Sequence, residues 1–235
     1  TFDQPGKYVF YCTRWCSAAH WRMRGVIEVA GAGEPAAPAE PPLYVQLDLD
    51  LDAPRAAPGA PLERPSAARG AAVALTAPEA VRALIAGRAH SPAAVWQAWR
   101  EDPAAAALTE QAAWDAVAWL WREQTAPAAL TEAGQLYADN CAACHGERGD
   151  GQGPFAPALT HQELEAQAEF GAHTVAPSDF TDLARMLAAS PALLQGKLLR
   201  GGMGTGMPYW GPIFTEAQTW ALTDWLWTFV FDYGR

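Results

Sequence analysis

The sequence predicts an α+β multidomain fold, in which a short β-rich segment precedes a mainly α-helical remainder. Two observations support this prediction. Residues 5–12 and 25–29 are rich in aromatic and β-branched side chains, which is typical of strands. From about residue 76 onward, apolar side chains recur with the period of amphipathic helices. The chain has 235 residues, enough for one large domain or two smaller ones.

The connection between these two parts contains one further predicted strand. Residues 30–42 consist almost entirely of Ala, Gly, Pro and Glu, which predicts a linker partly extended by its prolines. Residues 43–52 then alternate between apolar and polar side chains, which predicts a strand with one buried face. Its aspartates would line the solvated face, where they lack the convergent oxygens that calcium requires. Residues 31–72 are therefore a linker with one strand.

A single Cys141-x-x-Cys144-His145 motif ends a predicted helix over residues 131–143. Two thiols at this spacing can bond to the two vinyl groups of one porphyrin, and the histidine that follows can ligate its iron. A bare C-x-x-C would also suit a redox dithiol or half a zinc site. The immediate histidine and the lack of a second C-x-x-C favour a c-type haem.

The other two cysteines lie between the two predicted N-terminal strands. Cys12 and Cys16 are followed by His20 and Met23, in the pattern C-x3-C-x3-H-x2-M. Two thiolates, an imidazole and a thioether suit copper, whereas structural zinc does not normally use methionine. The stretch resembles the CuA site of cytochrome c oxidase subunit II and of nitrous-oxide reductase. The resemblance implies that the two cysteines bridge two copper ions. It further implies that His20 and Met23 each ligate one copper ion, with the backbone carbonyl of Arg14 as a further ligand.

The CuA resemblance also carries expectations about the fold and the location of the protein. In that family the second histidine ligand lies on an earlier strand of a β-sandwich cupredoxin. Residues 1–30 are thus expected to be the C-terminal fragment of a CuA cupredoxin, with the second histidine upstream of Thr1. Because haem c is attached outside the cytoplasm, we expect an export signal or membrane anchor upstream as well, and a periplasmic or extracytoplasmic, membrane-associated location.

The C-terminal part, residues 128–235, resembles a class I cytochrome c. The resemblance rests on the helix that leads into the haem motif, a Gly-rich loop after it, a Met-Pro loop and a final aromatic helix. It implies that His145 is the proximal iron ligand and that Met207 is the distal one. Met203, which is flanked by glycines, is a competing distal ligand. A His/Met pair leaves no open iron position, which favours electron transfer.

The middle of the chain is predicted to be helical over residues 77–87, 92–101 and 109–123, with Thr76 and Thr109 as N-caps. The last of these helices aligns without gaps with the final helix of the chain. Both contain a Leu/Phe-Thr-Glu start and a Trp-Leu-Trp end. We therefore interpret residues 73–127 as a haem-free, degenerate cytochrome-like region, a repeat of the C-terminal half of the cytochrome domain.

Both cofactor motifs describe one-electron sites without a nucleophile, a general base or an open metal position. The expected function is electron transfer through one haem c coupled to a binuclear CuA centre. The chain would be part of, or donor to, a terminal reductase such as nitrous-oxide reductase or a haem-copper oxidase with this type of subunit II. The alternative is a stand-alone periplasmic cytochrome c carrier or copper-binding protein with a vestigial copper loop.

The expected partner is a redox protein, either a cytochrome c or a terminal reductase or oxidase. The formal net charge of −10 argues against binding to nucleic acid. No catalytic centre is recognisable in this chain, so whether it belongs to an enzyme stays open at this point.

Overall fold

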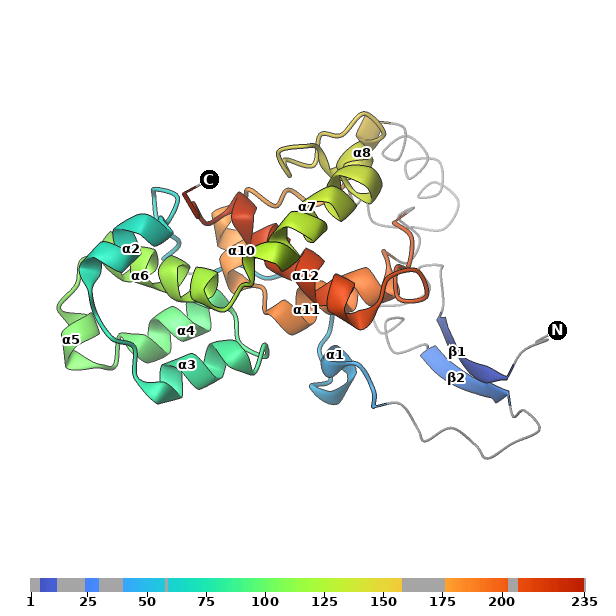
Figure 1. Cartoon of the computed structure of the whole chain (residues 1–235), viewed down its shortest axis with the longest axis horizontal. Coiled ribbons are helices and arrows are strands. Elements are labelled where there is room, and N and C mark those ends of the chain that lie inside the picture. The colour runs from blue at the N-terminus through green and yellow to red at the C-terminus, as the bar shows by residue number, and fades with distance from the viewer. Residues whose placement is uncertain are drawn as a thin grey trace.

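The computed structural model of the chain describes residues 5–11, 24–29, 40–57, 59–157, 176–202 and 207–234. Its elements, in chain order, are β1 (Gly6–Tyr11), β2 (Arg24–Val29), α1 (Leu43–Gln46), α2 (Ala67–Val73), α3 (Glu79–Ala86), α4 (Pro92–Trp99), α5 (Pro103–Ala106), α6 (Glu110–Glu123), α7 (Pro127–Asn140), α8 (Ala142–His145), α10 (Leu183–Ala188), α11 (Pro191–Arg200), α12 (Glu216–Leu226) and the 3-10 helix η2 (Trp227–Phe229). Figure 1 shows α2 to α6 gathered on one side, α7 to α12 beside them, and the strand pair at the opposite end.

The two strands form one antiparallel pair, β1 with β2. Phe10 is 52% exposed and Ile27 is 39% exposed, so no second sheet covers these side chains within the described residues. A β-sandwich needs two facing sheets, and the described part of the chain contains one two-stranded sheet. The prediction of a β-sandwich cupredoxin at the N-terminus is therefore wrong, whereas the mainly helical remainder is confirmed.

The strand predicted over residues 43–52 is also wrong. The segment begins with helix α1, and a turn follows it. Leu51 is buried, but helix packing buries it and not a neighbouring strand. Tyr44 and Leu51 lie against α11 at Gly196, where an added Cβ would come within 2.7 and 2.9 Å of their side chains. The segment thus covers a face of α11.

Helices α3, α4 and α6 confirm the three predicted central helices, with slightly shorter ends. Thr109 caps α6 as predicted, because its hydroxyl accepts the backbone N–H of Ala112 at 3.2 Å. Thr76 does not cap α3, since that helix begins after Pro78. Helix α2 was not predicted, because the sequence between residues 53 and 72 reads as a connection rich in small residues.

Helices α2 and α6 cross in close contact. A Cβ on Gly70 would lie 1.9 Å from the backbone oxygen of Asp115, so only glycine allows this approach. The carboxylate of Asp115 accepts the backbone N–H of Ser66 at 2.7 Å. It also pairs with the guanidinium of Arg69 at 2.7 Å. These contacts fix the start of α2 on the middle of α6.

Helices α7 and α12 cross in a similar way. A Cβ on Gly134 of α7 would lie 2.7 Å from the ring of Trp225 on α12. The start of α12 carries a complete capping box, in which Thr215 and Gln218 each bond the other's backbone N–H. The crossing places the end of α7, where the haem motif begins, over the last turns of the chain.

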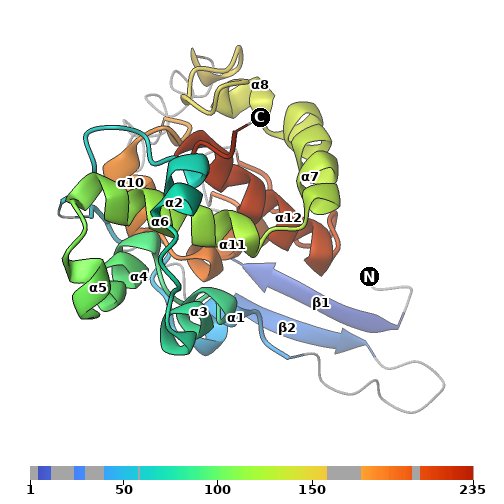
Figure 2. The same ribbon diagram turned by 60° about the vertical axis from the view of Figure 1, so that its left-hand side comes forward.

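One apolar core joins the two helical groups. Trp121 of α6 meets Trp227 edge-on, with ring centroids 5.6 Å apart, and Phe231 lies beside both. Figure 2 shows α6 running alongside the helices of the C-terminal group. Both groups contribute to the same cluster of buried side chains. None of the described helices is both long and apolar enough to cross a lipid bilayer.

Candidate haem c site

The Cys141-x-x-Cys144-His145 motif forms a single helical turn at the end of α7. The backbone N–H groups of Cys144 and His145 both donate to the carbonyl of Cys141, at 3.1 and 2.9 Å. Gly146 ends the turn with a φ of +79°. The hydroxyl of Tyr137, one turn earlier, donates to the carbonyl of Gly146 at 2.8 Å. The motif is thus anchored at both ends.

The two thiols are unpaired and partly buried. Burial, with a smaller contribution from the neighbouring Cys144, raises the pKa of Cys141 to about 12. Burial also raises the pKa of Cys144. A reactive dithiol needs easily formed thiolates, which an electropositive environment provides. The raised pKa values of Cys141 and Cys144 do not favour a reactive dithiol.

The imidazole of His145 is oriented by a backbone carbonyl. Its Nδ1 lies 3.2 Å from the carbonyl oxygen of Ser178, and the ring stacks on Phe180 with centroids 4.7 Å apart. A proton on Nδ1, donated to that carbonyl, leaves Nε2 as the ligating nitrogen. Burial lowers the pKa of His145, and the bond to Ser178 partly offsets this effect. The neutral imidazole, which is the form that binds iron, is favoured.

A glycine-rich loop wraps around this turn. The backbone N–H of Gly151 donates to the carbonyl of His145 at 2.8 Å, and that of Gly153 donates to the carbonyl of Cys144 at 3.1 Å. A Cβ on Gly151 would lie 2.5 Å from the carbonyl oxygen of Pro177. A Cβ on Gly153 would lie 2.4 Å from that of Ala143. The loop brings the segment that carries Ser178 against the motif, and no larger residue would permit this approach.

Met207 is partly buried and packs against the apolar core. Its carbonyl accepts the backbone N–H of Gly202 at 3.2 Å, so the two ends of the Gly-Met loop are paired. Gly201 has a φ of +72°, and a Cβ there would lie 2.8 Å from the carbonyl oxygen of Met207. The competing distal ligand, Met203, lies outside the described residues.

The Cys141–His145 turn therefore fits a c-type haem, with two attachable thiols and one oriented imidazole, and Met207 offers a partly buried thioether in the glycine-rich loop. The carbonyl of Ser178 was not anticipated from the sequence, since a backbone acceptor leaves no mark in the residue type. In the described part of the chain, no three His, Cys, Asp or Glu side chains gather as a metal cluster. The predicted copper ligands all lie outside the described residues: Cys12, Arg14, Cys16, His20 and Met23.

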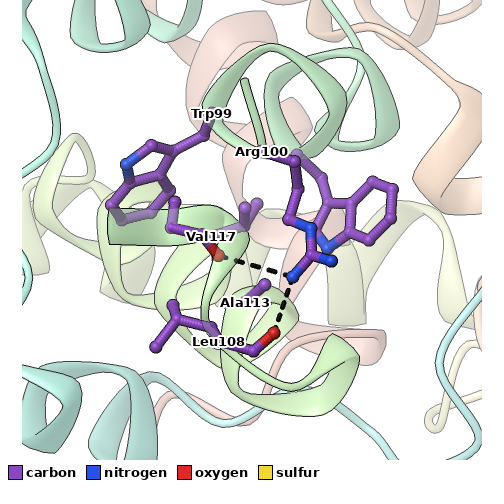
Figure 3. A pocket seen from close by; sticks show the side chains of 7 residues that line it. Trp99, Arg100, Leu108, Ala113 and Val117 are labelled. Atoms are coloured by element: carbon purple, nitrogen blue, oxygen red, sulfur yellow. Dashed lines mark hydrogen bonds between the residues drawn. The ribbon is translucent and has the colours of Figure 1, made fainter. Parts of the chain in front are cut away.

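The region between α4 and α6 is filled by aromatic side chains. Trp96 and Trp114 stack with centroids 5.2 Å apart, and Trp99 is buried beside them. The guanidinium of Arg100 closes this group by donating to the carbonyl of Leu108 at 2.7 Å (Figure 3). A small void here has no room for a water molecule; its lining consists of Trp96, Trp99, Arg100, Ala105, Leu108, Ala113 and Val117.

Comparison with known proteins agrees with the haem site. Residues 130–229 match the family model described as cytochrome c. Site and match together define a cytochrome c domain in the C-terminal part of the chain, which indicates haem-based electron transfer. No curated protein matches the chain.

One solved structure is similar, the reducing HAO-like protein complex of Kuenenia stuttgartiensis, with 20% identity and a TM-score of 0.36. The match covers 52% of this chain and 62% of that one. A TM-score this low does not establish a shared fold.

Proposed function

We propose that this chain transfers single electrons through one covalently bound haem c. Cys141 and Cys144 would form the thioethers, and His145 and Met207 would be the axial ligands. The observation that carries this proposal is the hydrogen bond between His145 Nδ1 and the carbonyl of Ser178, because it directs the other ring nitrogen to the iron. Bound in this way, the haem supplies one-electron chemistry at a raised potential, with no open coordination position.

Optical spectroscopy of methionine variants tests the axial ligands. Met207→Ala is expected to abolish the charge-transfer band of the methionine-ligated ferric haem while covalent haem remains. Met203→Ala, a matched change in the same glycine-rich loop, is expected to leave that band intact. The opposite result would make Met203 the distal ligand. The double variant Cys141→Ser, Cys144→Ser is further expected to contain no covalent haem. Covalent haem in this variant would overturn the proposed attachment site.

The haem is proposed to work with a copper centre in residues 12–23. Two thiolates, an imidazole and a thioether favour copper, and the ends of this segment are joined. Tyr11, the last residue of β1, lies opposite Arg24, the first residue of β2. Cys12 and Cys16 would bridge two copper ions, with His20, Met23 and the carbonyl of Arg14 as ligands.

Metal analysis with electron paramagnetic resonance tests the copper site. A mixed-valence pair shares one unpaired spin and gives a multi-line copper hyperfine pattern. We expect this pattern in protein that is purified with its haem and exposed to copper. Full haem with no copper in such protein would instead support the second candidate, a stand-alone cytochrome c carrier with a vestigial copper loop.

Residues 73–127 are proposed to be a haem-free relative of the C-terminal half of the cytochrome domain. Ser91 caps α4 and Ser190 caps α11, each by accepting a backbone N–H at 3.2 Å, and each is followed by a proline. Thr109 and Thr215 cap α6 and α12 in the same way. A haem-to-protein ratio of one is expected, because residues 73–127 contain no cysteine that could attach a second haem.

We further propose that the protein is an extracytoplasmic electron relay. Its partner would be another redox protein, either a cytochrome c or a terminal reductase of the nitrous-oxide reductase or haem-copper oxidase type. Stopped-flow mixing of the reduced protein with each purified oxidase or reductase tests the partner. Haem oxidation that is fast and saturable with only one of them would identify it. Equal, slow oxidation by all would contradict a dedicated partner.

A further inference from the structure

The last turn of α11 is held by an ionic cluster of one buried arginine, Arg200, with the partly buried Lys197 and Asp52. The guanidinium of Arg200 donates to both carboxylate oxygens of Asp52, at 2.9 and 2.7 Å. The ammonium of Lys197 donates to the same carboxylate at 2.7 Å. The side chain of Arg200 is 1% exposed, so Asp52 is the counter-charge for a cation that has almost no access to water. Asp52 lies outside residues 130–229, the part of the chain that matches the cytochrome c family.

The same turn of α11 makes backbone contacts with the glycine-rich loop that carries Met207. Gly201 follows Arg200 directly and lies against the backbone of Met207 and Pro208. The N–H of Gly202 donates to the carbonyl of Met207 at 3.2 Å. Further along, the N–H of Trp210 donates to the carbonyl of Leu198, also in the last turn of α11, at 2.9 Å. Both sides of the loop are therefore attached to the residues that Asp52 holds.

The segment around Asp52 is itself rigidly placed. The carboxylate of Asp50 accepts the backbone N–H groups of Asp52 and Ala53, at 2.9 and 3.2 Å. Leu51 is buried against Gly196, so the backbone on one side of Asp52 is packed on α11 itself. Farther on, the N–H of Ala57 donates to the carbonyl of Ala184 in α10 at 2.8 Å. Asp52 is thus fixed relative to two helices of the cytochrome domain.

We propose that Asp52 is a positioning residue for the distal haem ligand: through Arg200 and Gly201 it holds the loop that carries Met207 against the iron. This inference rests on the proposed His/Met ligation. A buried guanidinium that loses its carboxylate must be exposed to water to regain solvation. Arg200 can reach water only if the last turn of α11 moves, and that movement would draw Gly201 and Gly202 away from Met207.

The test uses the full-length haem protein and imidazole, a small external ligand that competes with methionine for ferric iron. Asp52→Asn keeps the shape of the side chain and removes its charge. Loss of one charge-assisted contact is expected to raise imidazole affinity by about tenfold and to weaken the methionine charge-transfer band. The backbone N–H groups of Gly202 and Trp210 are expected to exchange faster with deuterium. Asp52→Glu, which restores the charge, is expected to recover most of each effect.

Asp224→Asn is the matched control, because it removes the carboxylate of another partly buried ion pair, with Arg88, which meets the start of α11 and not the last turn that Asp52 holds. It is expected to leave imidazole affinity and the band unchanged, even if it lowers stability. If Asp52→Asn does not fold, Lys197→Met removes one cation of the cluster and is expected to raise imidazole affinity about threefold. Wild-type imidazole affinity in the folded Asp52 or Lys197 variant would overturn the proposal.

The test of Asp52 as a positioning residue can fail independently of the test of Met207 as the iron ligand. If Met207→Ala removes the methionine band and Asp52→Asn leaves it intact with unchanged imidazole affinity, the ligation stands and the positioning role fails. If Met207→Ala leaves the band intact, both fail, since Asp52 would then support a loop without a ligand.

Discussion

The guanidinium of Arg88 donates two hydrogen bonds to the carboxylate of Asp224, at 3.1 and 3.2 Å, and lies 4.5 Å from the ring centroid of Trp220. Arg88 follows α3 and has a φ of +56°, a backbone conformation that is costly for a residue with a side chain. Its carbonyl also accepts the N–H of Ala192 at the start of α11. One strained residue thus joins the central helices to both α11 and α12.

We expect Arg88→Met to destabilise the protein by about 2 kcal/mol, because it leaves the partly buried carboxylate of Asp224 without a partner. Arg88→Lys is expected to recover only part of this loss, since an ammonium cannot form the two-pronged contact. Chemical denaturation measures both. Adding Asp224→Asn to Arg88→Met should restore much of the lost stability. If the stability loss of the double variant equals the sum of the two single losses, Arg88 and Asp224 do not interact directly.

The same pair gives a pH dependence. Burial raises the pKa of Asp224 above its ordinary value, and Arg88 partly offsets that rise. An acid with a raised folded pKa costs stability when it is ionised, so the cost appears as the pH rises through that pKa. The deficit of Arg88→Met relative to wild type is therefore expected to shrink as the pH falls and Asp224 takes up a proton. A deficit independent of pH would show that the lost stability is apolar packing.

Two glycines at helix crossings are expected to differ in how much stability their replacement by alanine costs. A Cβ on Gly70 would meet the backbone of Asp115, whereas a Cβ on Gly134 would meet the side chain of Trp225. Backbone cannot move aside without shifting a helix, but a ring can turn by a few degrees. Gly70→Ala is therefore expected to cost about 3 kcal/mol and Gly134→Ala about 1 kcal/mol. Thermal unfolding of the two variants checks the order, and equal losses would contradict it.

Local features of the sequence located most of the helices. The Thr-Glu start at Thr109 is confirmed as a cap because a cap depends on the residues that follow it within one turn. The haem turn is equally local, since Cys141, Cys144 and His145 lie within one helical turn.

The larger failures concern contacts between distant parts of the chain, whereas the wrong cap at Thr76 is a local failure. The alternation of apolar and polar side chains in residues 43–52 is typical of a strand, but its cause here is contact with distant residues. Leu51 is buried by α11, and Asp52 is paired with two cations that lie 145 and 148 residues further along the chain. The β-sandwich was inferred from a resemblance confined to a ligand-bearing segment, and such a segment does not determine the sheets around it. The carbonyl of Ser178 has no signature in any side chain.

Tyr137→Phe tests how the haem turn is anchored. The hydroxyl of Tyr137 is buried and donates to the carbonyl of Gly146, and its ring lies 5.1 Å from that of Phe229. Removing the hydroxyl keeps the ring contact and leaves a carbonyl without this donor, which is expected to cost about 1 kcal/mol. Covalent haem attachment is expected to persist, because the backbone bonds of the turn remain. Denaturation of the haem protein measures the loss, and wild-type stability would show that the hydroxyl has no role in anchoring the turn.

Acid titration of stability tests the Asp52 cluster independently of the haem spectrum. Burial of Asp52 alone would raise its pKa, but the contacts with Arg200 and Lys197 outweigh burial and hold the pKa well below its ordinary value of 3.8. An acid with a depressed folded pKa stabilises the fold above its unfolded pKa, and this contribution is lost as the pH falls toward the folded value. Wild type is therefore expected to exceed Asp52→Asn by about 2 kcal/mol at neutral pH. The difference should stay constant down to about pH 5 and narrow below about pH 4, where the unfolded carboxyl takes up its proton. If the stability difference between wild type and Asp52→Asn narrows instead between pH 6 and pH 8, another group controls it. Asp52 would then not be the residue that holds α11.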